Sequence, residues 1–273
     1  MKPRIRFMSC VVAVVLAASG VAAGALPAGA LPAGALPAGA APASPTNKYV
    51  ALGDSYAAGQ GGGDYLNDCL QSPSGYPALL DAVKGTNLLR NASCSLATTD
   101  DVTDTQLSAL NRGTTLVTLT VGGNDLNVAG IAAVCLSPDL AACQQAISDA
   151  TFFVFSGQLS ASLVDTYTKI DAAAPRAHTI VTGYPYLFEP SAIDPRITQL
   201  NMATTLLNQA IQGAVVQAQL AGASIEYVDV SGAFSGHGIG SLDPWIYMPP
   251  VPDAFHPTPA GYEAYATAIQ AAL

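Results

Sequence analysis

The chain has 273 residues, half of them hydrophobic and only 11% charged, so it can form one substantial domain with a full core. This composition excludes an intrinsically disordered chain and a coiled coil, both of which are richer in charged residues. The net charge is −9, and it becomes about −12 without the three basic residues near the N-terminus. Because an acidic surface repels nucleic acids and anionic membranes, we expect no nucleic-acid partner.

The N-terminal residues have the pattern of an export signal. Lys2, Arg4 and Arg6 precede a short apolar run at residues 11–18, and small residues follow, up to a predicted cleavage site at Ala23. A membrane anchor is the alternative, but the apolar run is short for a membrane span. We therefore interpret residues 1–23 as a signal peptide and expect a secreted protein with no stable membrane anchor.

A low-complexity segment follows the predicted signal. Residues 24–46 are rich in Ala, Pro and Gly, and the sequence ALPAG occurs three times within them. A segment without charges and with a proline at every fifth residue is typical of a linker or of an extended leader. We expect residues 47–273 to form the folded domain.

From residue 48 onwards, apolar runs that suit strands alternate with helical patterns. The strands are expected at residues 49–52, 115–121, 179–182 and 225–230. Helices are expected at residues 147–174, 197–221 and 259–273, the last one capped by Thr258 with Pro259 at its first position. Apolar, largely β-branched strands suit a parallel sheet that is covered on both faces. The pattern predicts a three-layer α/β/α sandwich with a central parallel sheet and its ligand site at the carboxyl ends of the strands.

Ser55 comes directly after the first predicted strand, in the sequence Gly53-Asp54-Ser55. A serine at this place either caps the next helix or acts as a nucleophile at the sheet edge. The stretch does not match the G-x-S-x-G nucleophile elbow, because residue 57 is alanine. It does not match a phosphate-binding loop either, because no Lys-Ser/Thr pair follows the glycines. Taken alone, Ser55 fits a helix cap better than a nucleophile.

Two other polar stretches carry candidate catalytic residues. Asn124 lies in the sequence Gly-Gly-Asn-Asp directly after the second predicted strand, and Asp253 and His256 lie just before the last helix. Considered separately, the first stretch fits an ordinary Gly-Asn turn, and the second fits a loop histidine beside the capping threonine. His237 is a rival catalytic base, but no acidic residue stands at a useful spacing from it.

Together the three stretches resemble the SGNH (GDSL) hydrolase family over essentially the whole chain from residue 48. Gly-Asp-Ser near the start, Gly-Gly-Asn-Asp in the middle and Asp-x-x-His near the end occur in this order. The resemblance implies that Ser55 is the nucleophile, that His256 is the general base, and that Asp253 orients and charge-stabilises the imidazole. It also implies that the backbone N–H of Ser55 and the side-chain amide of Asn124 form an oxyanion hole.

One position departs from the family pattern. The family often has a Cys-Ser-Gly-Ala-Thr-Thr run whose glycine supplies another oxyanion donor, and Leu96 stands at that position here. A leucine keeps the backbone N–H, but it cannot follow glycine into every backbone conformation. We expect Leu96 to complete the oxyanion hole through its N–H.

Four cysteines lie outside the predicted signal peptide: Cys69, Cys94, Cys135 and Cys143. An even number in an exported protein favours two disulfides, for which three pairings are possible. Cysteines without CxxC spacing and only three histidines do not suggest a zinc site, and we expect no metal. The pairing Cys69–Cys94 with Cys135–Cys143 is expected because it joins neighbours in sequence and because the family often bridges these regions.

The sequence thus predicts a secreted serine esterase or lipase that hydrolyses small-molecule or lipid esters through an acyl-enzyme, without a cofactor. A polysaccharide O-deacetylase would use the same machinery, and a non-catalytic secreted binding protein is the alternative from another class. The apolar residues 245–250 fit either an acyl-binding wall or the core. The sequence does not define the oligomeric state.

Overall fold

The computed structural model describes residues 46–190 and 194–273. The predicted signal peptide, and the predicted linker except for its last residue, lie outside these ranges. The first strand, β1 (Asn47–Gly53), begins where the predicted catalytic domain begins. Among the helices that the structure describes, none has both the length and the apolar character needed to cross a membrane.

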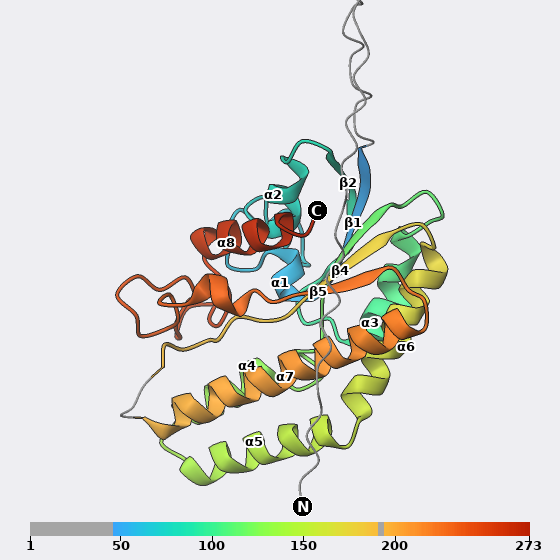
Figure 1. Ribbon diagram of the computed structural model, residues 1–273. Coiled ribbons are helices and arrows are strands. Elements are labelled where there is room, and N and C mark those ends of the chain that lie inside the picture. The colour runs from blue at the N-terminus through green and yellow to red at the C-terminus, as the bar shows by residue number, and fades with distance from the viewer. Residues whose placement is uncertain (1–45, 191–193) are drawn as a thin grey trace, which may run out of the picture. The chain divides into compact units, whose positions relative to one another are not determined.

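Five parallel strands form the central sheet, in the order β2-β1-β3-β4-β5 (Figure 1). The other four strands are β2 (Thr86–Asn91), β3 (Leu116–Thr120), β4 (His178–Thr182) and β5 (Ile225–Val228). All five residues of β3 are buried, as expected for a strand that is covered on both faces. The sequence prediction missed β2, because this edge strand is polar and only partly buried and lacks a β-branched apolar run.

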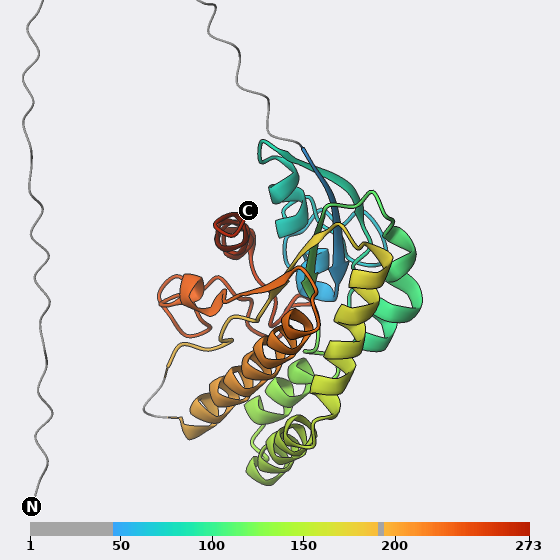
Figure 2. The ribbon, with the colours of Figure 1, turned by 45° about the vertical axis from the view of Figure 1, so that its right-hand side comes forward.

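Helices cover both faces of the sheet, which confirms the predicted three-layer sandwich. In Figure 2, α2 (Tyr76–Asp81) and α8 (Pro259–Gln270) lie on one side, and α6 (Gln158–Ala173) and α7 (Pro195–Leu220) lie on the other. The hydroxyl of Thr258 accepts a hydrogen bond from the Gly261 N–H at 3.3 Å, so the predicted cap of the last helix is present. The short helical segments are α1 (Ser55–Ala58), α3 (Thr99–Asp101), a π-helical turn at Val102–Gln106 and 3₁₀ turns at Leu107–Ala109 and Ser231–Phe234.

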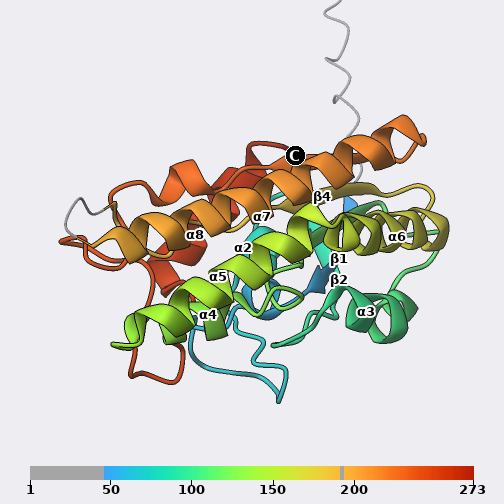
Figure 3. The same cartoon turned by 90° about the horizontal axis from the view of Figure 1, so that it is seen from below.

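The prediction of one continuous helix at residues 147–174 is wrong. The segment forms two helices, α5 (Leu140–Phe155) and α6, separated at Gly157, whose φ of +80° is the left-handed conformation that ends a helix. A further helix, α4 (Val128–Leu136), precedes them and was not predicted. Helices α4, α5 and α7 lie side by side and extend the molecule beyond the carboxyl edge of the sheet (Figures 1 and 3).

Two disulfides join the expected partners. Cys69–Cys94 links the loop after α1 to the segment after β2, and Cys135–Cys143 links α4 to α5.

Candidate active site

Ser55 is the first residue of α1, immediately after β1 ends at the carboxyl edge of the sheet. The helix cap is the preceding residue, Asp54, whose carboxylate accepts a hydrogen bond from the Tyr56 N–H at 2.9 Å. Gly59, with a φ of +95°, ends this single turn. The interpretation of Ser55 as a helix cap is therefore wrong, and its hydroxyl is available for other contacts.

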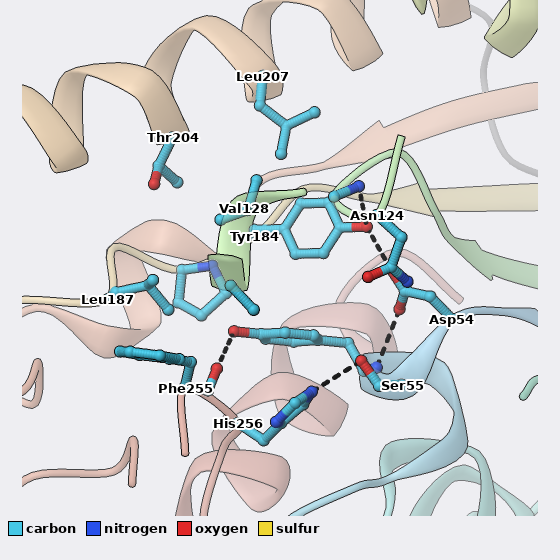
Figure 4. Close-up of a pocket in the computed structure, with 14 residues that line it drawn as sticks. Asp54, Ser55, Asn124, Val128, Tyr184, Leu187, Thr204, Leu207, Phe255 and His256 are labelled. Atoms are coloured by element: carbon cyan, nitrogen blue, oxygen red, sulfur yellow. Dashed lines mark hydrogen bonds between the residues drawn. The ribbon is translucent and has the colours of Figure 1, made fainter. Parts of the chain in front are cut away.

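His256 meets Ser55 from the opposite end of the chain. Its Nε2 lies 2.8 Å from the Ser55 Oγ, although the two residues are 201 positions apart (Figure 4). Two backbone hydrogen bonds fix the loop that carries His256. The Phe255 N–H donates to the Tyr247 carbonyl at 2.8 Å, and the Tyr247 N–H donates to the His256 carbonyl at 3.0 Å. The Tyr56 hydroxyl also donates to the Phe255 carbonyl at 2.7 Å, which ties this loop to α1.

The other ring nitrogen of His256 faces a backbone carbonyl. Its Nδ1 lies 3.0 Å from the Ala254 oxygen, and the structure places this carbonyl, rather than the Asp253 carboxylate, at the hydrogen-bonding position. Because a carbonyl oxygen only accepts, Nδ1 must carry the proton, which leaves the lone pair of Nε2 directed at the Ser55 hydroxyl. The neutral ring is thus held in the tautomer that a base at Ser55 requires.

Burial lowers the pKa of His256, while the Ala254 carbonyl and the charge of Asp253 partly offset this by stabilising the imidazolium. Burial raises the pKa of Tyr65, and the interaction of its phenol with Asp253 raises it further. The Asp253 carboxylate therefore acts on His256 through its charge and makes no hydrogen bond to the ring, while the Asp253 backbone carbonyl also favours the imidazolium.

Asn124 lines the same pocket as Ser55 and His256. Its side-chain Nδ2 donates one hydrogen bond to the Ala97 carbonyl at 2.9 Å, which fixes the amide and leaves its second N–H for a ligand. Leu96 has a φ of +68°, the left-handed conformation that a glycine would favour, and its side chain is 77% exposed. Leu96 thus adopts the positive-φ conformation that is common for glycine and rare for leucine.

A buried polar network behind Ser55 was missed by the sequence analysis. The Tyr184 hydroxyl donates to the Asp54 carboxylate and accepts from the Gly123 N–H at 3.0 Å. The Asn208 side chain fixes Tyr184 in turn, accepting from its N–H and donating to its carbonyl, both at 2.8 Å. Burial raises the pKa of Asp54 to about 7. The available signal was the position of Tyr184 two residues after β4, at the same sheet edge as Ser55 and Asn124.

The model of the GDSL-like lipase/acylhydrolase family matches residues 51–264. The chain belongs to this family. The predicted family, fold and ester-hydrolase activity are thereby confirmed: this is an ester-hydrolysing enzyme of the SGNH type.

Related proteins agree with this assignment. The hydrolase is 34% identical to Lipase 1 of Streptomyces coelicolor over 224 residues, which are 78% of this chain and 81% of that protein. Crystal structures of an extracellular lipase from Streptomyces rimosus and of phospholipase A1 from Streptomyces albidoflavus each superpose with a TM-score of 0.76. The Streptomyces rimosus lipase is 32% identical and covers 84% of this chain and 100% of its own. The Streptomyces albidoflavus phospholipase is 33% identical and covers 83% of this chain and 99% of its own.

Apolar side chains complete the wall of the hydrolase pocket. Val128, Leu187, Leu207 and Phe255 line it together with the polar residues described above (Figure 4). Residues 245–250 do not line this pocket, so the first of the two interpretations of this segment, an acyl-binding wall, is not supported here. Within this segment Ile246 belongs to the core.

The other two histidines lie outside the pocket of the hydrolase. His237 stacks on Trp245, with 3.5 Å between ring centroids, and its Nδ1 lies 2.8 Å from the Asp243 carbonyl. His178 lies beside Ser224 and Glu226 at the start of β4. Neither ring faces Ser55, so the rival base His237 has no place in this site.

Proposed function

We propose that this hydrolase is a secreted esterase or lipase that cleaves carboxylic esters through an acyl-enzyme on Ser55. The observation that carries the proposal is the 2.8 Å contact between Ser55 Oγ and the Nε2 of a neutral, tautomer-fixed His256, inside a pocket with apolar walls. A serine hydroxyl becomes a nucleophile only when a neighbouring base takes its proton.

In the first half-reaction, the Ser55 oxygen forms a bond to the ester carbonyl carbon while Nε2 of His256 takes the hydroxyl proton. The same proton then passes to the departing alcohol as the carbon–oxygen bond of the ester breaks. In the second half-reaction, a water molecule attacks the acyl carbon and gives one proton to Nε2. The same proton then passes to the Ser55 oxygen as its bond to the acyl carbon breaks, which releases the carboxylic acid and restores the hydroxyl. The charge of Asp253 favours the imidazolium that forms in both steps.

The oxyanion of each tetrahedral intermediate needs hydrogen-bond donors. The N–H of Ser55 belongs to the first turn of α1, where backbone N–H groups have no partner within the helix. The free N–H of Asn124 is the second donor, and the Leu96 N–H is the third in this proposal. Removing one such donor costs about 10²–10³ in kcat.

Ester substrates with an apolar acyl group suit the walls formed by Val128, Leu187 and Leu207 better than acetylated sugars do. Secretion is supported by the export pattern at residues 1–23, by the two disulfides and by the extracellular relative from Streptomyces rimosus.

A panel of nitrophenyl esters and acetylated xylan tests the proposal. We expect turnover of the nitrophenyl esters, a loss of at least about 10³-fold in kcat for Ser55→Ala and His256→Ala, and about 10²–10³-fold for Asn124→Ala. His237→Ala is the matched control and should retain activity. No ester turnover by the wild type, or a loss in His237→Ala but not in His256→Ala, would contradict the proposal.

A further inference from the structure

The phenol of Tyr184 links α1, which carries Ser55, to the turn that carries Asn124. Tyr184 lies two residues after β4 and is 6% exposed. Its hydroxyl contacts the carboxylate of Asp54, the cap of α1, and lies 3.0 Å from the Gly123 nitrogen. An ionised carboxylate only accepts, so the hydroxyl donates to Asp54 and directs a lone pair at the Gly123 N–H. In Figure 4 the phenol lies between Asp54 and Asn124.

The turn packs directly against this phenol. A Cβ at residue 123 would lie 3.1 Å from the Cζ of Tyr184 and 3.2 Å from its hydroxyl oxygen, closer than most Cβ contacts in proteins. Within the described part of the chain, the other hydrogen bonds of residues 123–125 go to residues 97 and 99 and to the start of α4. Tyr184 therefore makes the hydrogen bond that connects the turn to the cap of α1.

Tyr184 is itself held on two sides. The Asn208 side chain on α7 accepts from the Tyr184 N–H and donates to its carbonyl, both at 2.8 Å. The rings of Tyr56 and Tyr184 meet edge to face, with 5.1 Å between their centroids. A phenol that is buried and fixed in this way keeps Asp54 and the turn at a set distance from each other.

We propose that Tyr184 is a positioning residue, which holds the Asn124 amide at the distance from Ser55 Oγ that the oxyanion requires. This inference rests on the proposed function, in which Asn124 stabilises the oxyanion. Tyr184 acts through Asn124, because the single proton of its hydroxyl is already donated to Asp54. A misplacement of about 1 Å in an active site can lower the rate by about 10²-fold, so a support of this kind has a large effect on kcat.

The first test compares the wild type with Tyr184→Phe on nitrophenyl butyrate at pH 8. Burial raises the pKa of Asp54 to about 7, so this carboxyl is mainly ionised under these conditions. We expect kcat to fall by about 10- to 100-fold and KM to stay within about threefold, because the oxyanion forms only during the reaction. Tyr49→Phe is the matched control. The Tyr49 hydroxyl is also buried, but it contacts Thr118 outside the pocket, so kcat should stay within about twofold.

A double-mutant cycle with Asn124→Ala tests whether Tyr184 acts through Asn124. Without the amide that it positions, the loss of the Tyr184 hydroxyl should lower kcat by less than about threefold. Similar losses in both backgrounds, or full activity of Tyr184→Phe alone, would overturn the inference. Retained kcat in Asn124→Ala would instead contradict the oxyanion role of Asn124 in the proposed function, so the two failures are distinguishable.

A trifluoromethyl ketone measures stabilisation of the oxyanion without turnover. The Ser55 oxygen bonds to its carbonyl carbon, the hydroxyl proton passes to Nε2 of His256, and the carbonyl oxygen becomes the oxyanion. The inhibition constant should rise in Tyr184→Phe by about the factor by which kcat/KM falls. The inhibition constant of the corresponding secondary alcohol, which forms no oxyanion, should stay within about twofold. An equal change for both compounds would mean that Tyr184 shapes the pocket, which overturns the proposal.

Gly123→Ala decides the question if Tyr184→Phe does not fold. Gly123 does not have a positive φ, so alanine fits its backbone, but the new methyl group forces the turn and the phenol apart by a few tenths of an ångström. The variant removes no hydrogen-bonding group. We expect a loss in kcat of at least about fivefold with an unchanged KM. Retention of wild-type kcat by this variant would overturn the inference.

Discussion

At the residue scale, His256 is controlled by two neighbours of different kinds. The Ala254 carbonyl fixes the tautomer through a hydrogen bond, and the Asp253 carboxylate acts through its charge. In serine hydrolases where a carboxylate itself holds Nδ1, changing the acid to its amide costs about 10⁴ in kcat, because the ring takes the wrong tautomer. A backbone carbonyl cannot be removed by such a change, so the tautomer of His256 does not depend on the side chain at residue 253.

Asp253→Asn should therefore keep kcat within about tenfold of the wild type at pH 8. The base must be neutral, so wild-type kcat/KM should fall as the pH decreases through the pKa of His256, with a midpoint below about 6.5. Because the charge of Asp253 raises this pKa, the midpoint of Asp253→Asn should lie lower still. A pH profile of kcat/KM for both proteins measures this. A loss near 10⁴-fold in kcat would instead mean that the Asp253 carboxylate holds Nδ1 directly in the working enzyme.

At the element scale, α1 after β1, the turn after β3 and the loop before α8 carry the pocket residues Ser55, Asn124 and His256. Leu96 lies in the loop between β2 and α3, in a left-handed conformation, and is not among the residues that line this pocket. A leucine in that conformation costs about 1–2 kcal/mol relative to an ordinary backbone. A proline substitution cannot test the Leu96 N–H, since a proline ring fixes φ near −65° and would rebuild the loop.

Leu96→Gly is the informative change, because glycine keeps the N–H and adopts a positive φ without strain. We expect activity within about threefold of the wild type and a gain of up to about 1 kcal/mol in the free energy of unfolding. Ester turnover and urea denaturation measure the two quantities. Leu70→Gly is the matched control, since Leu70 also has a positive φ, of +57°. A loss of activity of tenfold or more in Leu96→Gly alone would show that the leucine side chain itself takes part in the site.

At the scale of the whole molecule, the two disulfides cross-link loops of different length. Cys69 and Cys94 are 25 positions apart, and Cys135 and Cys143 are 8 positions apart. In the chain-entropy account, a bridge stabilises the folded protein by restricting the unfolded chain, and a longer loop gives a larger effect.

Replacing both cysteines of a bridge by serine should lower the free energy of unfolding by about 3.5 kcal/mol for Cys69–Cys94 and about 2.5 kcal/mol for Cys135–Cys143. Urea denaturation of the two double variants measures the difference, with the oxidised wild type, in which both bridges are intact, as reference. The opposite order would show that native contacts around the shorter bridge outweigh the loop entropy.

Local features of the sequence determined the layers of the fold and the positions of the main catalytic candidates. Apolar runs that end in glycine marked three of the central strands, and Thr258-Pro259 marked the start of the last helix. Ser55, Asn124 and His256 were assigned because the three stretches that carry them, taken together and in this order, resemble the SGNH family; each stretch alone fitted a cap, a turn or a loop. Strand ends and helix caps depend on residues within a few positions of one another, so they can be predicted without knowledge of the tertiary structure.

Contacts between distant parts of the chain decided the rest. The Asp54–Tyr184 hydrogen bond spans 130 positions and the Ser55–His256 contact spans 201, so the geometry of neither contact follows from the residues next to its partners in the sequence. The polar edge strand β2 is defined by its pairing with β1. The tertiary structure also decides that the Ala254 carbonyl, and not the Asp253 carboxylate, faces Nδ1 of His256. The loop is fixed by Tyr56 and Tyr247, and its backbone path, rather than residue spacing, sets which oxygen faces Nδ1.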